Sequence, residues 1–331
     1  MIVSRAPVRF SLGGGGTDLP SYAREHGGFV VAAAVDKYVS VCVARRFADT
    51  IRLAYSEMEI VEKVEQIRHR IVRSALQLTG ISRAVEIHSL ADVPANTGLG
   101  SSSTFTVALL NGLHTYKREI VPVEQLAREA CQIEIDILKE PIGKQDQYIA
   151  SFGGISAMTF EPNGNVSIER LPLADEVIDD LESSLIIYYS GVERSASSVL
   201  KEQAKTIVEN RDAAVARMHR IKQLGYETKR ILLSGNIDEY GELLHEHWTN
   251  KRKLASNMAD STIDEHYEAA RAAGAIGGKL MGAGGGGFFM FYVRVGDRRR
   301  VHQTLVGRGL RPLRFRFDFD GARIVANFHR S

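Results

Sequence analysis

Residues 94–105 have the sequence PANTGLGSSSTF, in which two glycines and three serines separate a strand-like segment from a strongly helical one. AVEIHSL at 84–90 predicts a strand, and SSSTFTVALLNGLHTYK at 101–117 predicts a helix buried on several sides. Backbone N–H groups at a helix N-terminus favour anions, and small residues let a phosphate approach them closely. An ordinary serine N-cap explains one serine but leaves the glycines and the other two serines without a reason. The stretch therefore predicts a phosphate-binding loop.

Two further glycine-rich stretches are LGGGGTD at 12–18 and KLMGAGGGGFF at 279–289. Either alone is also compatible with a simple turn, because glycine supplies the positive φ that tight turns need. Gly282, Gly284 and Gly287 have the spacing of a dinucleotide fingerprint, but that motif must open a helix, and FFMFYV at 288–293 predicts a strand. Lys279 is at the wrong spacing from the glycines for a Walker A loop. Leu280 also occupies the position after the lysine where that loop requires Ser or Thr.

The composition is that of an ordinary globular chain with balanced charge. Lys and Arg number 42 against 40 Asp and Glu, which leaves +2, and 44% of residues are hydrophobic. We therefore expect neither a nucleic-acid partner nor a membrane segment, and the short basic run 298–300 is interpreted as a solvated helix start. Cys42 and Cys131 predict two buried reduced thiols rather than a disulfide framework. The N-terminus lacks the apolar run of a signal peptide, so a cytoplasmic location is expected.

Strand-like and helix-like segments are unevenly distributed over the 331 residues. The first half is mainly strands, with an amphipathic helix expected over 62–79 and another that begins at Pro122 and has an apolar face. That face comprises Leu126, Ala130, Ile133 and Ile137. From about 192 to 273 the pattern is helical, and strands return at 275–281, 288–295 and 310–319. We predict two domains, 1–190 and 191–331.

Acidic and basic residues near the glycine stretches are candidates for proton and metal chemistry. Glu134 is expected on a helix and Asp146 in the turn-like segment after it. If this segment folds back on the phosphate loop, Glu134 could ligate magnesium while Asp146 meets an acceptor hydroxyl; an acidic pair on a solvated face is the alternative. Arg9 and Asp18 flank the first glycine run, where a surface salt bridge is the alternative.

The order of APVRFSLGGGGTD, PANTGLGSSSTF, GKQDQ and KLMGAGGGGFF resembles the GHMP kinases over nearly the whole chain. The resemblance implies an α+β fold, with an N-terminal domain of the ribosomal-S5-domain-2 type, a ferredoxin-like C-terminal domain and the active site between them. The third glycine stretch then becomes the closing wall of the cleft. GGGGTDLPSY, VDKYVSV and GKQDQYIASFGG look like the bacterial D-glycero-D-manno-heptose 7-phosphate kinases within this superfamily.

The resemblance also implies roles for individual residues. Asp146 would be the catalytic base, Arg9 would contact it and the transferred phosphoryl group, and Ser102 and Glu134 would bind magnesium. The ATP phosphates would be cradled by a set of loop residues: Pro94, Gly98, Leu99, Gly100, Ser101, Ser102 and Ser103. The sugar would be contacted by Gly15, Gly16, Thr17, Asp18, Arg194, Gly284 and Gly285. Arg194 and the basic residues at 251–253 are candidates for a phosphate carried by the substrate.

The function implied is an ATP- and Mg²⁺-dependent sugar kinase that phosphorylates the anomeric C1 hydroxyl of D-glycero-D-manno-heptose 7-phosphate. Its product would serve nucleotide-activated heptose biosynthesis for a capsule, an S-layer glycan or lipopolysaccharide, and the enzyme would be a monomer or homodimer. Gly15 and Gly16 replace the Glu-His that galactokinases carry before Thr-Asp, which argues against galactose. The alternatives are a kinase for another sugar, such as L-fucose or an N-acetylhexosamine, and a catalytically silent sugar-sensing regulator.

Overall fold

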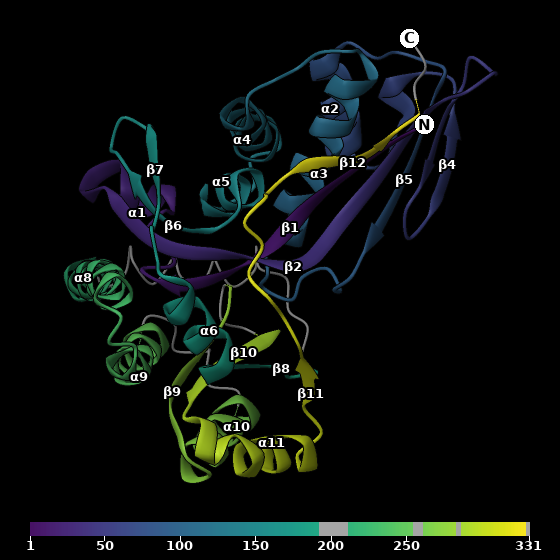
Figure 1. The fold of residues 1–331 in the computed structure, drawn as a ribbon. Helices are drawn as coiled ribbons and strands as arrows, with labels where there is room; N and C mark the ends of the chain where they lie inside the picture. The colour runs from purple at the N-terminus through teal and green to yellow at the C-terminus, as the bar shows by residue number, and fades with distance from the viewer. Residues whose placement is uncertain (192–210, 254–260, 283–285, 329–331) are drawn as a thin grey trace.

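The computed structural model describes residues 1–191, 211–253, 261–282 and 286–328. It contains an eight-stranded sheet and a four-stranded sheet with helices around and between them (Figure 1). Within the described residues, no helix combines the length and apolar character that a membrane crossing requires.

The larger sheet has the order β12-β1-β2-β5-β3-β4, and the hairpin β6-β7 joins it through β2. All its pairings are antiparallel except that of β3 with β5. Its strands are β1 (Ile2–Gly13), β2 (Gly28–Arg45), β3 (Ile51–Ala54), β4 (Met58–Val61), β5 (Val85–Ala91), β6 (Ile155–Phe160), β7 (Val166–Arg170) and β12 (Arg323–Asn327).

Helices of the N-terminal half cover one face of this sheet, on the side where α2 to α5 are seen in Figure 1. They are α2 (Arg70–Thr79), α3 (Ser101–Tyr116), α4 (Val123–Cys131) and α5 (Gln145–Phe152), while α1 (Pro20–His26) precedes β2. The helix expected over 62–79 is only the 10-residue α2, because Val64–Gln66 forms a separate 3₁₀ turn, η1. The Glu59 carboxylate accepts the N–H groups of Arg68 and His69 at the break, and these two hydrogen bonds replace the helical ladder there.

The helix predicted from Pro122 continues past α4 as a π-helical segment, η2 (Gln132–Ile137). Leu126, Ala130 and Ile133 are buried as expected, but Ile137 is exposed. A π turn widens the helix, so residues beyond it leave the face that a 3.6-residue period predicts. Glu134 lies in this segment and is buried.

The smaller sheet is antiparallel and has the order β11-β8-β10-β9. Its strands are β8 (Leu185–Tyr189), β9 (Ala275–Leu280), β10 (Phe288–Val293) and β11 (Arg311–Leu313). The helices around it are α6 (Asp175–Ser184), α9 (Asp238–Arg252), α10 (Ser261–Ala272) and α11 (Arg298–Gly307), with a 3₁₀ turn η3 (Val295–Asp297) before α11. Helix α8 (Arg211–Ser234) packs between α9 and the strands β1 and β2 of the larger sheet. The basic run 298–300 begins α11, as the sequence indicated.

The continuous apolar run of β10 reflects burial on both faces of the smaller sheet. Phe289 and Phe291 pack with α10 and α11, on the outer face. Met290 and Tyr292 point the other way, into a core shared with Phe10 of the larger sheet and with α8 and α9. The two halves of the chain therefore share one apolar interface.

The predicted division at residue 190 is crossed by both sheets. β8 precedes that position but pairs in the smaller sheet, and β12 follows it but pairs with β1 in the larger sheet. The division into 1–190 and 191–331 stays a prediction. Cys42 and Cys131 are both free, with Cys131 buried and Cys42 half-buried.

Candidate functional site

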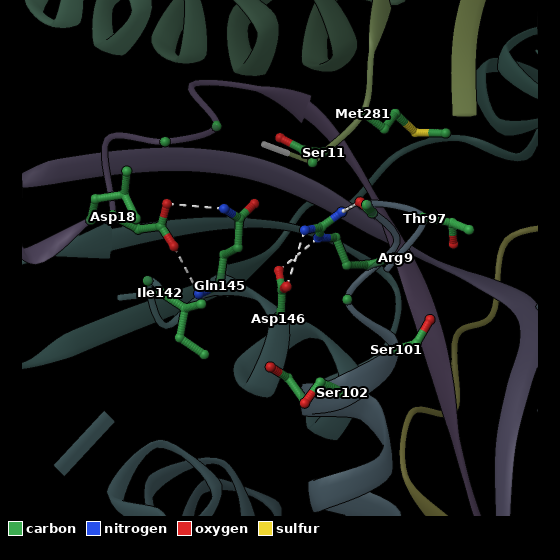
Figure 2. Close-up of a pocket in the computed structure, with 18 of the residues that line it drawn as sticks. Arg9, Ser11, Asp18, Thr97, Ser101, Ser102, Ile142, Gln145, Asp146 and Met281 are labelled. Atoms are coloured by element: carbon green, nitrogen blue, oxygen red, sulfur yellow. Dashed lines mark hydrogen bonds and ion pairs between the residues drawn. The ribbon is translucent and has the colours of Figure 1, made fainter. Parts of the chain in front are cut away.

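A cavity of about 240 Å³ lies where the first turn of α3, the start of α5 and the strand β1 meet α9 and β9. Most of the site residues predicted from the sequence line it: Arg9, Gly15, Gly16, Asp18, Gly98, Gly100, Ser101, Ser102, Ser103, Glu134 and Asp146. Figure 2 shows Asp146 between Asp18 on one side and the serines of α3 on the other.

The predicted phosphate loop ends at Gly100, which is the N-cap of α3 with φ +78°. None of the three serines is the N-cap: they form the first helical turn, and no side chain caps the helix. The first N–H groups of a helix lack partners within it, so this turn presents donors of the kind that bind phosphate. A Cβ on Gly100 would lie 2.9 Å from Asp146 Oδ2, so glycine is needed for both its φ and its close approach.

Arg9 and Asp146 form a bidentate ion pair beside the loop (Figure 2). Arg9 Nε donates to Asp146 Oδ1 at 2.7 Å and Nη2 donates to Oδ2 at 3.1 Å, while Nη1 donates to the Gly98 carbonyl at 2.6 Å. Successive side chains of β1 point to opposite faces of the sheet. Val8 and Phe10 therefore lie in the apolar core, whereas Arg9 between them points to the cavity. Arg9 is therefore held in one orientation, with its charge at the cavity.

Glu134 is almost completely buried behind the loop. Ser102 Oγ donates to its Oε1 at 2.9 Å, and Gln147 Nε2 donates to its Oε2 at 2.7 Å. Burial raises the pKa of Glu134 to about 7, although these hydrogen bonds favour the charged form. The carboxylate thus lacks a cationic partner among the described side chains.

Asp18 lies at the opposite end of the cavity and is held by Gln145. It accepts the Gln145 backbone N–H at 3.1 Å and the Gln145 Nε2 at 2.9 Å. Burial raises the pKa of Asp18, and the nearby carboxylate of Asp146 adds to the rise. Polar groups that a ligand can reach therefore extend on both sides of Asp146.

Four predicted site residues lie around or behind the cavity wall. Leu99 is in the apolar core, and its carbonyl accepts the Arg9 backbone N–H at 3.1 Å. The fully buried Thr17 hydroxyl lies 2.8 Å from the Gly14 carbonyl, which braces the first glycine loop. The Pro94 carbonyl accepts a hydrogen bond from Thr97 Oγ1 at 2.9 Å. Lys253, a candidate phosphate contact, is exposed and does not line the cavity.

Three predicted sugar contacts, Arg194, Gly284 and Gly285, lie outside the described residues. The flanks of the third glycine stretch are described, and they pack against the phosphate loop. A Cβ on Gly282 would lie 2.4 Å from Gly98 Cα, and one on Gly287 would lie 2.1 Å from the Thr97 carbonyl oxygen. This arrangement accounts for Gly282 and Gly287 without a nucleotide fingerprint.

The sequence did not indicate His247 or Lys279, which both line the cavity. They belong to α9 and β9, which are distant in sequence from the phosphate loop. One available signal was a lysine within AIGGKLM, because a charged residue is unusual in a strand that is otherwise small and apolar.

The comparisons with known proteins cover both halves of the chain. The family model for the GHMP kinases N terminal domain matches residues 62–154, and the model for the GHMP kinases C terminal domain matches residues 228–301. The D-glycero-α-D-manno-heptose 7-phosphate kinase of Campylobacter jejuni is 28% identical over 307 residues, which are 88% of this chain and 89% of that protein.

Two further relatives are similar over most of this chain. The structure of a D-glycero-D-manno-heptose 1-phosphate kinase from Bacteroides thetaiotaomicron superposes with a TM-score of 0.82 at 28% identity, over 99% of this chain and 100% of that one. The bifunctional fucokinase/GDP-fucose pyrophosphorylase of Arabidopsis thaliana is 25% identical over 89% of this chain but only 30% of its own length. The matched domains, the shared fold and the order of the motifs agree: the chain belongs to the GHMP kinases.

Proposed function

We propose that this chain is an ATP-dependent kinase that transfers the γ-phosphoryl group to the anomeric C1 hydroxyl of D-glycero-D-manno-heptose 7-phosphate. The observation that carries the proposal is the Arg9–Asp146 pair, which is held directly against the uncapped first turn of α3. A carboxylate and a cation beside a phosphate-binding helix terminus supply an acceptor for the hydroxyl proton and a counter-charge for the phosphoryl group. The heptose substrate is suggested by the two relatives named for kinases of phosphorylated heptose.

The nucleotide would extend from the phosphate loop toward a second pocket on its far side. That pocket shares Ser102 and Glu140 with the main cavity. Its other lining residues include aromatic and aliphatic groups suited to a flat base: Tyr55, His69, Ile71 and Leu138. The shared residues would lie beside the phosphate chain.

Magnesium would be held by Glu134 and Ser102. The buried carboxylate of Glu134 has no cationic partner among the described side chains, and the Ser102 hydroxyl oxygen lies 2.9 Å from it. Oxygen donors of this kind suit Mg²⁺, which commonly takes one or two protein ligands and completes its shell with water and phosphate. Among the described residues no group of three or more His, Cys, Asp or Glu is placed to hold a metal, so a site completed by the nucleotide fits best. When bound, the ion would neutralise charge on the phosphates.

The side chains of this chain would perform the rest of the reaction by positioning and charge. Phosphoryl transfer has a loose transition state, so alignment and neutralisation dominate catalysis. Asp18 would accept hydrogen bonds from sugar hydroxyls, Asp146 would accept the proton of the C1 hydroxyl, and Arg9 would contact the transferred phosphoryl group. An anomeric hydroxyl is more acidic than an ordinary alcohol, so its deprotonation requires less assistance from the base.

A panel assay tests the proposed substrate. ADP release would be measured with purified enzyme and MgATP for heptose 7-phosphate, unphosphorylated heptose, L-fucose, galactose and an N-acetylhexosamine. We expect the highest kcat/KM for heptose 7-phosphate. A preference for L-fucose would favour the second candidate, which the fucokinase relative supports. A cytoplasmic location for the reaction stays a prediction from the sequence.

A further inference from the structure

Three basic side chains from the C-terminal half line the cavity and are more than nine-tenths buried. His247 and Lys251 belong to α9 and are 0% and 9% exposed, and Lys279 belongs to β9 and is 2% exposed. Lys251 is one of the basic residues at 251–253 predicted from the sequence as candidate phosphate contacts, whereas His247 and Lys279 have no role in the reaction described above. We call these three residues the basic cluster.

The fold places the basic cluster on the inner side of the smaller sheet. Lys279 is directly opposite Met290 in the β9–β10 pairing, so the two side chains share the face that points toward the larger sheet. His247 and Lys251 are one helical turn apart and therefore lie on the same face of α9. Lys251 Nζ donates to the carbonyl of Gly282, the residue that packs against the phosphate loop.

The carboxylates that line the same cavity are already engaged elsewhere. Asp146 is paired with Arg9, Asp18 is bonded to Gln145, and Glu134 is bonded to Ser102. Glu140 forms an ion pair with Arg70 at 3.1 Å. In the described part of the chain, each of these carboxylates is therefore bonded to a residue that does not belong to the basic cluster.

Within the described part of the chain, Lys251 and Lys279 have no carboxylate within ion-pair distance, and His247 has no partner for either ring nitrogen. Burying unpaired cations and polar nitrogens costs free energy unless a ligand supplies the missing partner. Burial lowers the pKa of Lys251 to about 8 and lowers that of Lys279 well below its usual value. The basic cluster is thus built for an anion that the chain itself does not provide.

Two anions could bind to the basic cluster, the transferred phosphoryl group and a phosphate on the acceptor. The transferred group belongs between Asp146 and the serines of α3, whereas Asp18 lies beyond Asp146 on the other side (Figure 2). The acceptor sugar occupies the Asp18 end in the mechanism above. The transferred group already has Arg9 and the first turn of α3 as positive partners, whereas the described lining of the cavity offers a phosphate on the acceptor no cations besides the basic cluster.

We propose that Lys251, Lys279 and His247 form the subsite for the phosphate group that the acceptor sugar already carries. The inference rests on the proposed function, since it needs an acceptor that is a sugar phosphate. It identifies the groups that would select heptose 7-phosphate over the free heptose, because a phosphate dianion gains charge-assisted hydrogen bonds from buried lysines.

The test compares two acceptors in matched variants. Lys279→Met and Lys251→Met remove one charge each and keep much of the side-chain volume, and Lys253→Met is the control because that lysine is exposed outside the cavity. For each charge removed, kcat/KM for heptose 7-phosphate should fall about 10- to 100-fold, mostly through KM, since hydrogen bonds to charged groups have that magnitude. For unphosphorylated heptose it should change less than about threefold, as it should for both acceptors in the control.

Other outcomes overturn the subsite. Equal losses on both acceptors would show that the lysines act on the transferred phosphoryl group, and no loss on either would show that they bind nothing. His247→Gln leaves both lysines in place and should give a smaller but still selective loss, which keeps the test open if a lysine variant fails to fold.

Calorimetric binding of heptose 7-phosphate without ATP separates this inference from the proposed function. If wild-type enzyme turns over neither heptose, the proposed function fails. Binding that Lys279→Met weakens at least tenfold would then still support the subsite. Binding that is absent, or unaffected by Lys279→Met, would overturn it.

Discussion

Replacement of Asp146 by Asn tests the proposed base with the smallest change in shape. Both carboxylate oxygens accept hydrogen bonds from Arg9, at 2.7 and 3.1 Å. Asn keeps one acceptor but presents N–H groups where the second was, so it cannot take the proton of the acceptor hydroxyl. General-base catalysis contributes about 10²- to 10⁴-fold, so kcat should fall by that factor, or by about 2.7 to 5.4 kcal/mol at 1.36 kcal/mol per decade. An acidic anomeric hydroxyl favours the lower half of this range.

The assay is coupled ADP release at saturating MgATP and heptose 7-phosphate, together with a separate titration of ATP binding. ATP affinity should stay within about threefold, because the first turn of α3 and Ser102 are unchanged in Asp146→Asn. Asp136→Asn is the matched control, since Asp136 is exposed on the same segment as Glu134. A kcat in Asp146→Asn equal to that of wild type would refute the assignment of Asp146 as base.

Three further predictions concern the metal, the glycine contact and the stability of the fold. Glu134→Gln should weaken the apparent Mg²⁺ affinity at fixed ATP by at least about 10-fold, measured by magnesium titration of activity; unchanged affinity would remove Glu134 as a ligand. Gly282→Ala places a Cβ 2.4 Å from the phosphate loop at a φ of +72°, so it should lower the unfolding free energy by at least about 1 kcal/mol, whereas Gly296→Ala, in open space, should not. His114 donates to Glu129 at 2.6 Å, and this hydrogen bond raises the pKa of His114 in the folded state. The protonated imidazole therefore stabilises the fold fully below about pH 6.5, the pKa of an unfolded histidine, and this stabilisation is lost as the pH rises through the higher folded pKa. Urea unfolding should therefore show His114→Asn destabilised by about 2 kcal/mol at pH 6 and by less at pH 9; a pH-independent difference would contradict this origin.

The local features of the site could be predicted from the sequence because short-range rules govern them. A helix that follows glycines presents free N–H groups wherever it lies in the fold, so the helix start at GLGSSS could be predicted, and its binding of phosphate stays a prediction. Arg9 and Asp146 were predicted to lie in contact through the family resemblance, and Arg9 Nε lies 2.7 Å from Asp146 Oδ1. Their contact joins residues 137 positions apart, which no local pattern encodes.

The unpredicted part of the cavity depends on packing between the two halves of the chain. Lys279 lies in a strand pattern and His247 in a helix pattern, and only the meeting of α9 and β9 with β1 exposes them to the site. The break before α2 has a similar cause. The Glu59 carboxylate accepts the N–H groups of Arg68 and His69, which follow it by nine and ten residues in the sequence. The π turn at Glu134 arises within one helix, but no simple residue pattern announces it.

The central claim is that a phosphoryl group is added to C1 of a heptose already phosphorylated at C7. ³¹P and ¹H NMR of the product formed from D-glycero-D-manno-heptose 7-phosphate and MgATP tests it most directly. The account predicts one new phosphorus resonance coupled to the anomeric proton, with the C7 phosphate retained. A new phosphate at any other position, or no product from this sugar under conditions where another sugar is phosphorylated, would contradict it.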